Sequence, residues 1–320
     1  MTKNRKGRED IAAMVRRSFD GMALSTDEDA ITEITEGWFN AVYSVRLADG
    51  RETILKIAPP RTVEVLTYEE RLMETEVAAM KLVAAKTDMP VPAVLYYDDR
   101  RDLCDSDYFF MEKSVGDNYH SVKKRLAPDT ISAIDRQIGS YLRQMNGIRQ
   151  PSYFGYDGNP ALRGGTWREA FLKIIAAVLE DGEKKRADLG VPYDAVYALM
   201  ERHAHHLNAA PAPHLVHWDC WDPNVIVQDG TVVGILDFER VLWADPLMES
   251  LFRTRNPEQL AGYGKTQFSP DEEVRCTLYA AYLHLVMRIE CEYRHYDDDS
   301  TRISSRQALG ETLRWLREHD

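Results

Sequence analysis

The side chains best suited to chemistry lie close together in the second half of the chain. An acid, an amide and a second acid follow one another there as Asp219, Asn224 and Asp237. In a magnesium-dependent phosphoryl-transfer site, one Asp takes the proton of the acceptor hydroxyl, while an Asn and a second Asp hold the metal that bridges the phosphates. The order and spacing predict such a site, with Asp219 as the base and Asn224 and Asp237 as metal ligands.

Two apolar, β-branched runs are expected to position Asn224 and Asp237. They cover residues 225–227 and 232–236 and are joined through Asp229-Gly230, a strong hairpin signal. Asn224 then enters one strand and Asp237 leaves the other, so their oxygens finish at the same end and suit Mg²⁺. The alternative is that the two Asp residues are turn formers and Asn224 is a strand cap.

The composition is that of a soluble globular chain. Its 320 residues, 44% of them hydrophobic, are enough for two lobes. The N-terminal stretch has no apolar core, so no secretory signal is expected, and no apolar run approaches the length of a membrane span. The four cysteines have no C-x-x-C spacing and are expected to be free thiols of a cytoplasmic protein. The sequence indicates no oligomeric state.

The net charge of −12 comes from 40 basic and 52 acidic residues. Because phosphate binding needs a basic patch, this balance argues against a nucleic-acid partner. It fits a cationic small substrate better than an anionic one. Solubility alone is the simpler explanation of an acidic surface.

The first part of the chain is expected to bind a nucleotide. Residues 31–58 predict three strands, and the first turn holds Gly37 and Asn40, which suit a close approach to phosphate. With a single glycine, an ordinary hairpin turn is the alternative. Lys56 lies between apolar residues of the third strand, and we expect its ammonium to reach the nucleotide phosphates. The alternative is an edge strand from which this lysine points to solvent.

A helix predicted over residues 69–84 carries the preferred partner of Lys56. That partner is Glu76, because a Lys–Glu pair between strand and helix positions the lysine of a kinase site. The competing carboxylates are Glu69, Glu70 and Glu74.

The pattern changes from strands to helices near Gly116. We therefore expect an α+β, bilobal fold. A nucleotide-binding lobe over residues 1–115 would hold a small antiparallel sheet and one main helix, and a mostly helical lobe over residues 116–320 would carry the catalytic loop and the acceptor site. The connector is expected to offer backbone groups to an adenine ring at Met111, Glu112 and Ser114.

With these residues, the chain resembles the aminoglycoside phosphotransferase and choline-kinase-like family, which shares its overall fold with protein kinases. The resemblance runs from about residue 31 to residue 252. The matching positions are Gly37, Asn40, Tyr43, Lys56, Glu76, Met111-Glu112, His217, Asp219, Asn224, Asp237 and residues 243–249. It implies ATP as the donor, with GTP as the alternative, Mg²⁺ at Asn224 and Asp237, and His217 and Asp245 as structural supports of the catalytic loop.

Two departures from the family pattern stand out. Glu239 gives Asp-Phe-Glu where protein kinases have Asp-Phe-Gly, and Glu249 stands where the family usually has a second Asp. Neither removes a metal ligand, but the second is expected to weaken the anchoring of the loop.

A small-molecule acceptor is expected, because five residues separate Glu239 from Asp245 and leave no room for a long activation loop. Carboxylates around it would bind ammonium groups, and an aromatic cage would favour a quaternary amine. The candidate contacts are Trp218, Trp221, Asp222, Glu239, Glu290 and Glu292. Loop packing is an equal alternative for the tryptophans, and a solvated helix face is the preferred interpretation of Glu290 and Glu292.

The predicted function is therefore ATP- and Mg²⁺-dependent phosphorylation of a hydroxyl group, on an aminoglycoside-like or other antibiotic. One alternative is a metabolic kinase for choline, a sugar or an amino alcohol. Another, of a different class, is a non-catalytic nucleotide-binding regulator. The retention of Lys56, Asp219, Asn224 and Asp237 argues against that regulator.

Overall fold

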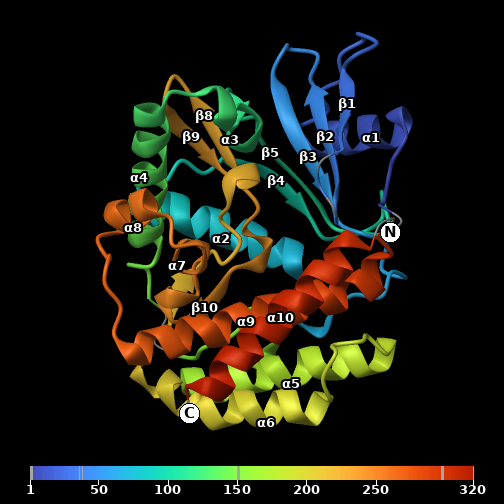
Figure 1. The fold of residues 1–320 in the computed structure, drawn as a ribbon. Helices are drawn as coiled ribbons and strands as arrows, with labels where there is room; N and C mark the ends of the chain where they lie inside the picture. The colour runs from blue at the N-terminus through green and yellow to red at the C-terminus, as the bar shows by residue number, and fades with distance from the viewer. Residues whose placement is uncertain (1–2, 36, 38, 150–151, 297–298, 320) are drawn as a thin grey trace.

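A five-stranded antiparallel sheet forms the smaller lobe (Figure 1). The computed structural model describes residues 3–35, 37, 39–149, 152–296 and 299–319. The strand order is β1-β2-β3-β5-β4, so β3 is central. The strands are β1 (Ile31–Ile34), β2 (Ala41–Arg46), β3 (Glu52–Ile57), β4 (Val94–Asp98) and β5 (Tyr108–Glu112). The three strands expected in residues 31–58 are confirmed.

Helices cover both faces of this sheet. Helix α2 (Leu72–Lys86) packs against one face, where Ile54 and Val77 belong to the same core, and α1 (Arg8–Ser18) packs on the other, where Ile11 meets Leu55. Burial on both faces explains why β3 is an almost continuous apolar run and why a lysine within it needs a charged partner.

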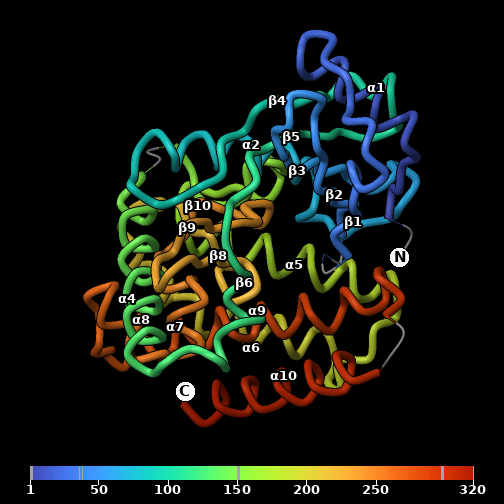
Figure 2. Tube along the Cα trace, turned by 90° about the horizontal axis from the view of Figure 1, so that it is seen from above, coloured from blue at the N-terminus to red at the C-terminus, as the bar shows by residue number. Residues whose placement is uncertain are grey.

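Helices build the larger lobe, and this confirms the bilobal α+β fold. Its long helices are α4 (Pro128–Met145), α5 (Trp167–Lys185), α6 (Tyr193–His203), α9 (Pro270–Arg294) and α10 (Ser300–Glu318). The shorter ones are α3 (Tyr119–Val122), α7 (Ser250–Thr254) and α8 (Pro257–Tyr263). A capping box of Ser269 and Glu272 opens α9, which packs between α5 and α10 (Figures 1 and 2).

The predicted hairpin is present as β8 (Val225–Gln228) and β9 (Thr231–Ile235), and β6 (Asp117–Asn118) pairs with β8. Gly116, with φ +153°, lets the connector reach this hairpin, because a Cβ there would lie 2.6 Å from the carbonyl oxygen of Val227. Strand β7 (His214–Val216) pairs with β10 (Leu242–Ala244). These two small sheets frame the loop that carries Asp219.

All four cysteines are free, buried thiols. Among the helices that the model describes, none is long and apolar enough to cross a membrane.

Candidate active site

The loop that carries Asp219 is held in a strained shape by buried side chains. Trp218 has a positive φ of 65°, which is uncommon for a bulky residue. The Glu249 carboxylate accepts hydrogen bonds from the backbone N–H groups of His217, at 2.9 Å, and Trp218, at 3.1 Å. Arg253 donates to the carbonyl oxygen of Trp218 at 3.0 Å. The loop is therefore fixed on both sides of one residue, Trp218.

The expectation that a glutamate at position 249 weakens the anchoring of this loop is wrong. Its side chain also accepts a hydrogen bond from Asn146 at 2.9 Å, so three donors from two segments meet one carboxylate. The carboxylate is fully buried, and burial raises its pKa to about 7.

His217 and Asp245 lie within the scaffold of the same loop. The His217 ring packs on Phe238, with ring centres 4.6 Å apart, and burial lowers the pKa of His217 to about 4, so its imidazole is neutral. Asp245 accepts a hydrogen bond from the Tyr279 hydroxyl at 2.7 Å and pairs with Arg275. It connects the end of β10 to α9.

Asn224 and Asp237 leave the hairpin at the same end, as predicted. The backbone N–H of Leu236 donates to the carbonyl oxygen of Asn224 at 2.9 Å. The Asn224 amide nitrogen donates to the carbonyl oxygen of Asp219 at 2.9 Å, so its oxygen is the atom that can reach a metal. Asp237 has a left-handed backbone, with φ 67°, and its side chain is 33% exposed.

Lys56 is buried in the centre of the sheet, and the alternative of an exposed edge lysine is wrong. Its ammonium donates to Glu76 at 2.7 and 2.9 Å and to Asp237 at 2.7 Å. Burial alone would lower the pKa of Lys56, but the carboxylates of Asp237, Glu76 and Glu239 raise it well above its usual value. The structure thus selects Glu76 among the candidate partners of this lysine.

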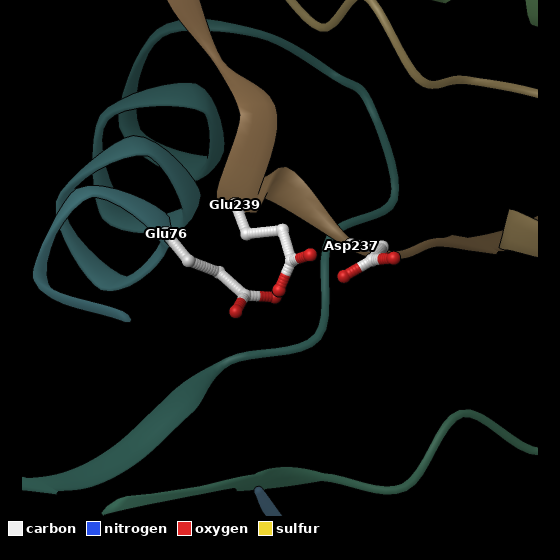
Figure 3. A group of neighbouring side chains, drawn as sticks. All are labelled: Glu76, Asp237 and Glu239. Atoms are coloured by element: carbon white, nitrogen blue, oxygen red, sulfur yellow. The ribbon is translucent and has the colours of Figure 1, made fainter. Parts of the chain in front are cut away.

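Three carboxylates surround that single ammonium. Oxygens of Glu76, Asp237 and Glu239 lie within 4.8 Å of one another (Figure 3). Burial raises the pKa of Glu76 to about 8, but the Lys56 ammonium still faces the carboxylates of Asp237 and Glu239, so the group carries excess negative charge. A divalent cation next to Asp237 and Asn224 would offset that excess and would find the oxygen ligands that Mg²⁺ prefers. The residues present therefore fit such an ion.

Glu239, predicted as an acceptor contact, lies instead beside Asn40 and Lys56, two residues predicted to bind the nucleotide. Its carboxylate accepts a hydrogen bond from the Asn40 amide at 2.8 Å and lies 3.4 Å from the Lys56 ammonium. Asn40 thus donates to a side-chain carboxylate in this structure, and its contact with a nucleotide phosphate stays a prediction. Gly37 is exposed at the same turn.

Arg240 is a site residue that the sequence reasoning missed. Its Nε lies 3.9 Å from Asp219 Oδ2, and its guanidinium carbon lies 5.5 Å from the centre of the Trp218 ring. Burial raises the pKa of Asp219 to about 7, although its side chain keeps 31% of its surface exposed, and the charge of Arg240 opposes the increase. The available signal was a basic residue directly after Asp-Phe-Glu.

The remaining acceptor candidates separate into buried and exposed groups. Glu290 is buried and bonded to Arg240 at 3.1 Å, so the solvated-face interpretation is wrong for it. Trp218 is buried and packs on Tyr282, with ring centres 5.1 Å apart, which supports loop packing. Trp221 is 52% exposed.

Two more acceptor candidates are paired with basic side chains. Glu292 pairs with Arg288 at 2.8 Å and Arg302 at 3.3 Å, and Asp222 pairs with Lys123 at 2.8 Å. Glu292 therefore belongs to the contact between α9 and α10.

In the connector, some of the backbone groups that we expect to contact adenine are already hydrogen-bonded within the sheet. The N–H of Glu112 donates to the carbonyl oxygen of Ala93 at 2.9 Å, and Met111 and Glu112 pair with β3. Ser114 packs on the hairpin, because a Cβ on Gly234 would lie 2.6 Å from its hydroxyl oxygen. Adenine contacts from this segment therefore remain a prediction for backbone atoms beyond the Glu112 N–H.

Comparison with known proteins gives one family match and many structural neighbours. Residues 30–273 match the model of the phosphotransferase enzyme family. A Thermobifida fusca structure assigned as a fructosamine-3-kinase superposes with a TM-score of 0.69 at 20% identity, covering 98% of this chain and 100% of that one. The aminoglycoside phosphotransferase APH(4)-Ia, solved with AMP-PNP and hygromycin B, gives 0.65 at 14% identity, covering 95% and 98%.

Curated relatives match over a shorter stretch. A subtelomeric hrmA-associated cluster protein of Aspergillus fumigatus is 30% identical over 124 residues, which is 38% of this chain and 24% of that protein. The chain thus spans about a quarter of the length of that relative.

Proposed function

Because the chain belongs to the phosphotransferase enzyme family, we propose that it transfers the γ-phosphate of ATP to a hydroxyl group of a small molecule, with Mg²⁺ as the metal, and releases ADP. The observation that carries the proposal is the position of Lys56, whose ammonium joins Glu76 of the smaller lobe to Asp237 of the larger one. A lysine held in this way can meet nucleotide phosphates beside a metal ligand.

The roles of the site residues follow from their contacts. Asn224 and Asp237 would hold Mg²⁺, which offsets the charge of the phosphates when it is bound. Lys56 would bind phosphate oxygens, and the turn with Gly37 and Asn40 would cover them. Lys56 and Asn40 already face carboxylates in the structure, as they would face the phosphates.

Asp219 would accept the proton of the acceptor hydroxyl as the phosphoryl group is transferred. Its pKa near 7 leaves an appreciable fraction ionised at neutral pH, which suits a general base. Glu249 and Arg253 would keep the loop in place, so that little reorganisation is needed when the acceptor binds. Positioning and electrostatics, and not covalent chemistry by the protein, would supply the acceleration.

The donor is ATP in this proposal, with GTP as the alternative, and the free thiols fit a reducing cytoplasm. ATP analogues and ADP accompany structural neighbours that share this fold. Those neighbours are at most 20% identical, so their named acceptors, such as hygromycin B, do not transfer to this chain. Antibiotic and metabolic acceptors therefore both belong in the test.

The test is detection of a phosphorylated product. Purified protein is incubated with Mg·ATP and a panel of antibiotics, choline, ethanolamine and sugars, and products are analysed by mass spectrometry. A product that gains one phosphoryl group, and that Asp219→Asn does not form, supports the proposal. Binding of Mg·ATP without turnover of any acceptor above the Asp219→Asn control would favour the regulatory alternative.

A further inference from the structure

A row of alternately acidic and basic side chains begins at Asp219. Arg240 lies 3.9 Å from the Asp219 carboxylate on one side and 3.1 Å from Glu290 on the other. Arg294 then donates to Glu290 at 3.0 Å and pairs with Glu69, which precedes α2 in the smaller lobe. We call these five residues, Asp219, Arg240, Glu290, Arg294 and Glu69, the charged row.

The two buried carboxylates of the charged row, Glu290 and Glu69, are hydrogen-bonded to guanidinium groups. Glu290, Arg294 and Glu69 are all buried. Buried charges are tolerated when they are paired and hydrogen-bonded, and removing one partner leaves the other uncompensated. A ligand that required Glu290 or Glu69 would therefore have to displace an arginine from a buried pair.

This pairing disfavours a cationic acceptor. Its ammonium group would compete with two arginines for the same carboxylates. Close to the reacting hydroxyl it would also lie beside Arg240, whose guanidinium is next to the Asp219 carboxylate. Placing like charges together in this way is a common means of rejecting a wrong ligand.

An anionic acceptor is disfavoured for the opposite reason. The guanidinium of Arg240 already faces two carboxylates, Asp219 and Glu290. A carboxylate or phosphate brought to Arg240 would lie beside both of them. Glu290, Glu69 and the two arginines of the charged row are therefore already paired with one another, and none of them offers an unpaired charge to a ligand of either sign.

Resting on the phosphoryl transfer proposed above, we infer that the acceptor is an uncharged compound with several hydroxyl groups, such as a sugar or polyol. Such groups can donate to carboxylates and accept from guanidinium groups without breaking the pairs. Trp221, exposed two residues after Asp219, offers an apolar face for the carbon skeleton. This inference differs from the cationic acceptor expected from the net charge of −12.

The experiment compares acceptors that differ in charge and share a skeleton. Phosphoryl transfer from Mg·ATP is measured with glucose, glucosamine and glucuronic acid, with galactose, galactosamine and galacturonic acid, and with gentamicin and choline. We expect the neutral sugar of each three-member set to have a kcat/KM at least about tenfold above that of its charged relatives, and above those of gentamicin and choline, as differential binding predicts. A higher kcat/KM for an amine or an acid overturns the inference.

Binding of Mg·ADP, measured by calorimetry on the same protein, separates this inference from the proposed function. A higher kcat/KM for an amine or an acid, together with normal nucleotide binding, contradicts the inference and leaves the function intact. Absence of both nucleotide binding and transfer would contradict the function.

A variant of the charged row tests the cause of the selectivity. Arg294→Gln leaves Glu69 without its guanidinium partner and Glu290 paired with Arg240 alone, so the ratio of kcat/KM for glucosamine to that for glucose should rise by at least about fivefold. Arg294→Lys keeps the charge and should keep the ratio. A ratio does not depend on the folded fraction of a preparation, so partial unfolding does not hide the result. An unchanged ratio in Arg294→Gln would contradict the inference.

Should Arg294→Gln not fold, Glu290→Gln gives a second test, because it leaves Arg240 with one carboxylate fewer. It should then raise kcat/KM for glucuronic acid relative to glucose, and no rise would contradict the inference. Arg302→Gln, on α10 and paired with Glu292, is the matched control.

Discussion

The Glu249 carboxylate accepts a hydrogen bond from the backbone N–H of Trp218 at 3.1 Å, one residue before the proposed base. Because Trp218 has a positive φ, this contact holds the loop in a conformation that it would otherwise leave. The position of Asp219 thus depends on a side chain that lies thirty positions further along the chain.

Replacing Glu249 with Ala should therefore reduce both stability and activity. Two buried backbone N–H groups would lose their acceptor, which costs about 1–3 kcal/mol each. We expect the free energy of unfolding to fall by roughly 3 kcal/mol, measured by urea denaturation, and kcat to fall in the protein that remains folded. Glu180→Ala, on the exposed face of α5, is the control and should stay within about 0.5 kcal/mol of the wild type. A loss below about 1 kcal/mol for Glu249→Ala would show that the loop holds its shape without this residue.

Replacing Lys56 with Met should weaken nucleotide binding. The variant leaves Glu76, Asp237 and Glu239 without their shared cation, so phosphate would meet uncompensated negative charge. Calorimetry with Mg·ADP should show a Kd at least about tenfold higher, since about 1.4 kcal/mol of lost interaction has that effect. Lys81→Met, an exposed position on α2, controls for the loss of a lysine. Equal affinities for the two variants would rule out contact between Lys56 and phosphate.

The pH dependence of kcat/KM should report the ionisation of Asp219. Burial raises the pKa of this carboxyl to about 7, so the base loses its charge, and the rate falls, as the pH drops below that value. Arg240 opposes the shift, so Arg240→Gln should move the acidic limb of the profile to higher pH. A limb near pH 4 in the wild-type protein would show that another group controls the rate.

Metal binding should depend on the two residues at the end of the hairpin. Asp237→Asn and Asn224→Ala each remove or neutralise one oxygen ligand, and we expect at least about tenfold more Mg²⁺ to be needed for half-maximal ADP binding. Asp229→Asn, at the exposed tip of the same hairpin, should behave as the wild type. An identical Mg²⁺ requirement in all three variants would place the metal elsewhere.

The hairpin and the Lys56 strand were predictable because short-range patterns decide them. Asp229-Gly230 between two β-branched runs specifies the turn, and a lysine between apolar neighbours indicates a buried charge with a partner. The choice of Glu76 as the partner of Lys56, over the neighbouring glutamates, followed from its position along the helix.

The charged row was not predictable in the same way. Glu290 and Glu292 look alike in the sequence, yet the first faces Arg240 and the second faces α10. Their environments depend on how α9 packs between its neighbours, which is a tertiary property. The effect of Glu249 on the loop was predicted wrongly for a related reason. Whether its carboxylate contacts the loop depends on the path of the chain after β10.

The most direct test of the central claim separates binding from catalysis at Asp219. Asp219→Asn keeps the shape of the side chain and removes the base, so it should bind Mg·ATP with the wild-type Kd. Its rate of phosphoryl transfer should fall by about 10²–10⁴-fold, the usual contribution of a general base. Wild-type turnover in this variant would contradict the account.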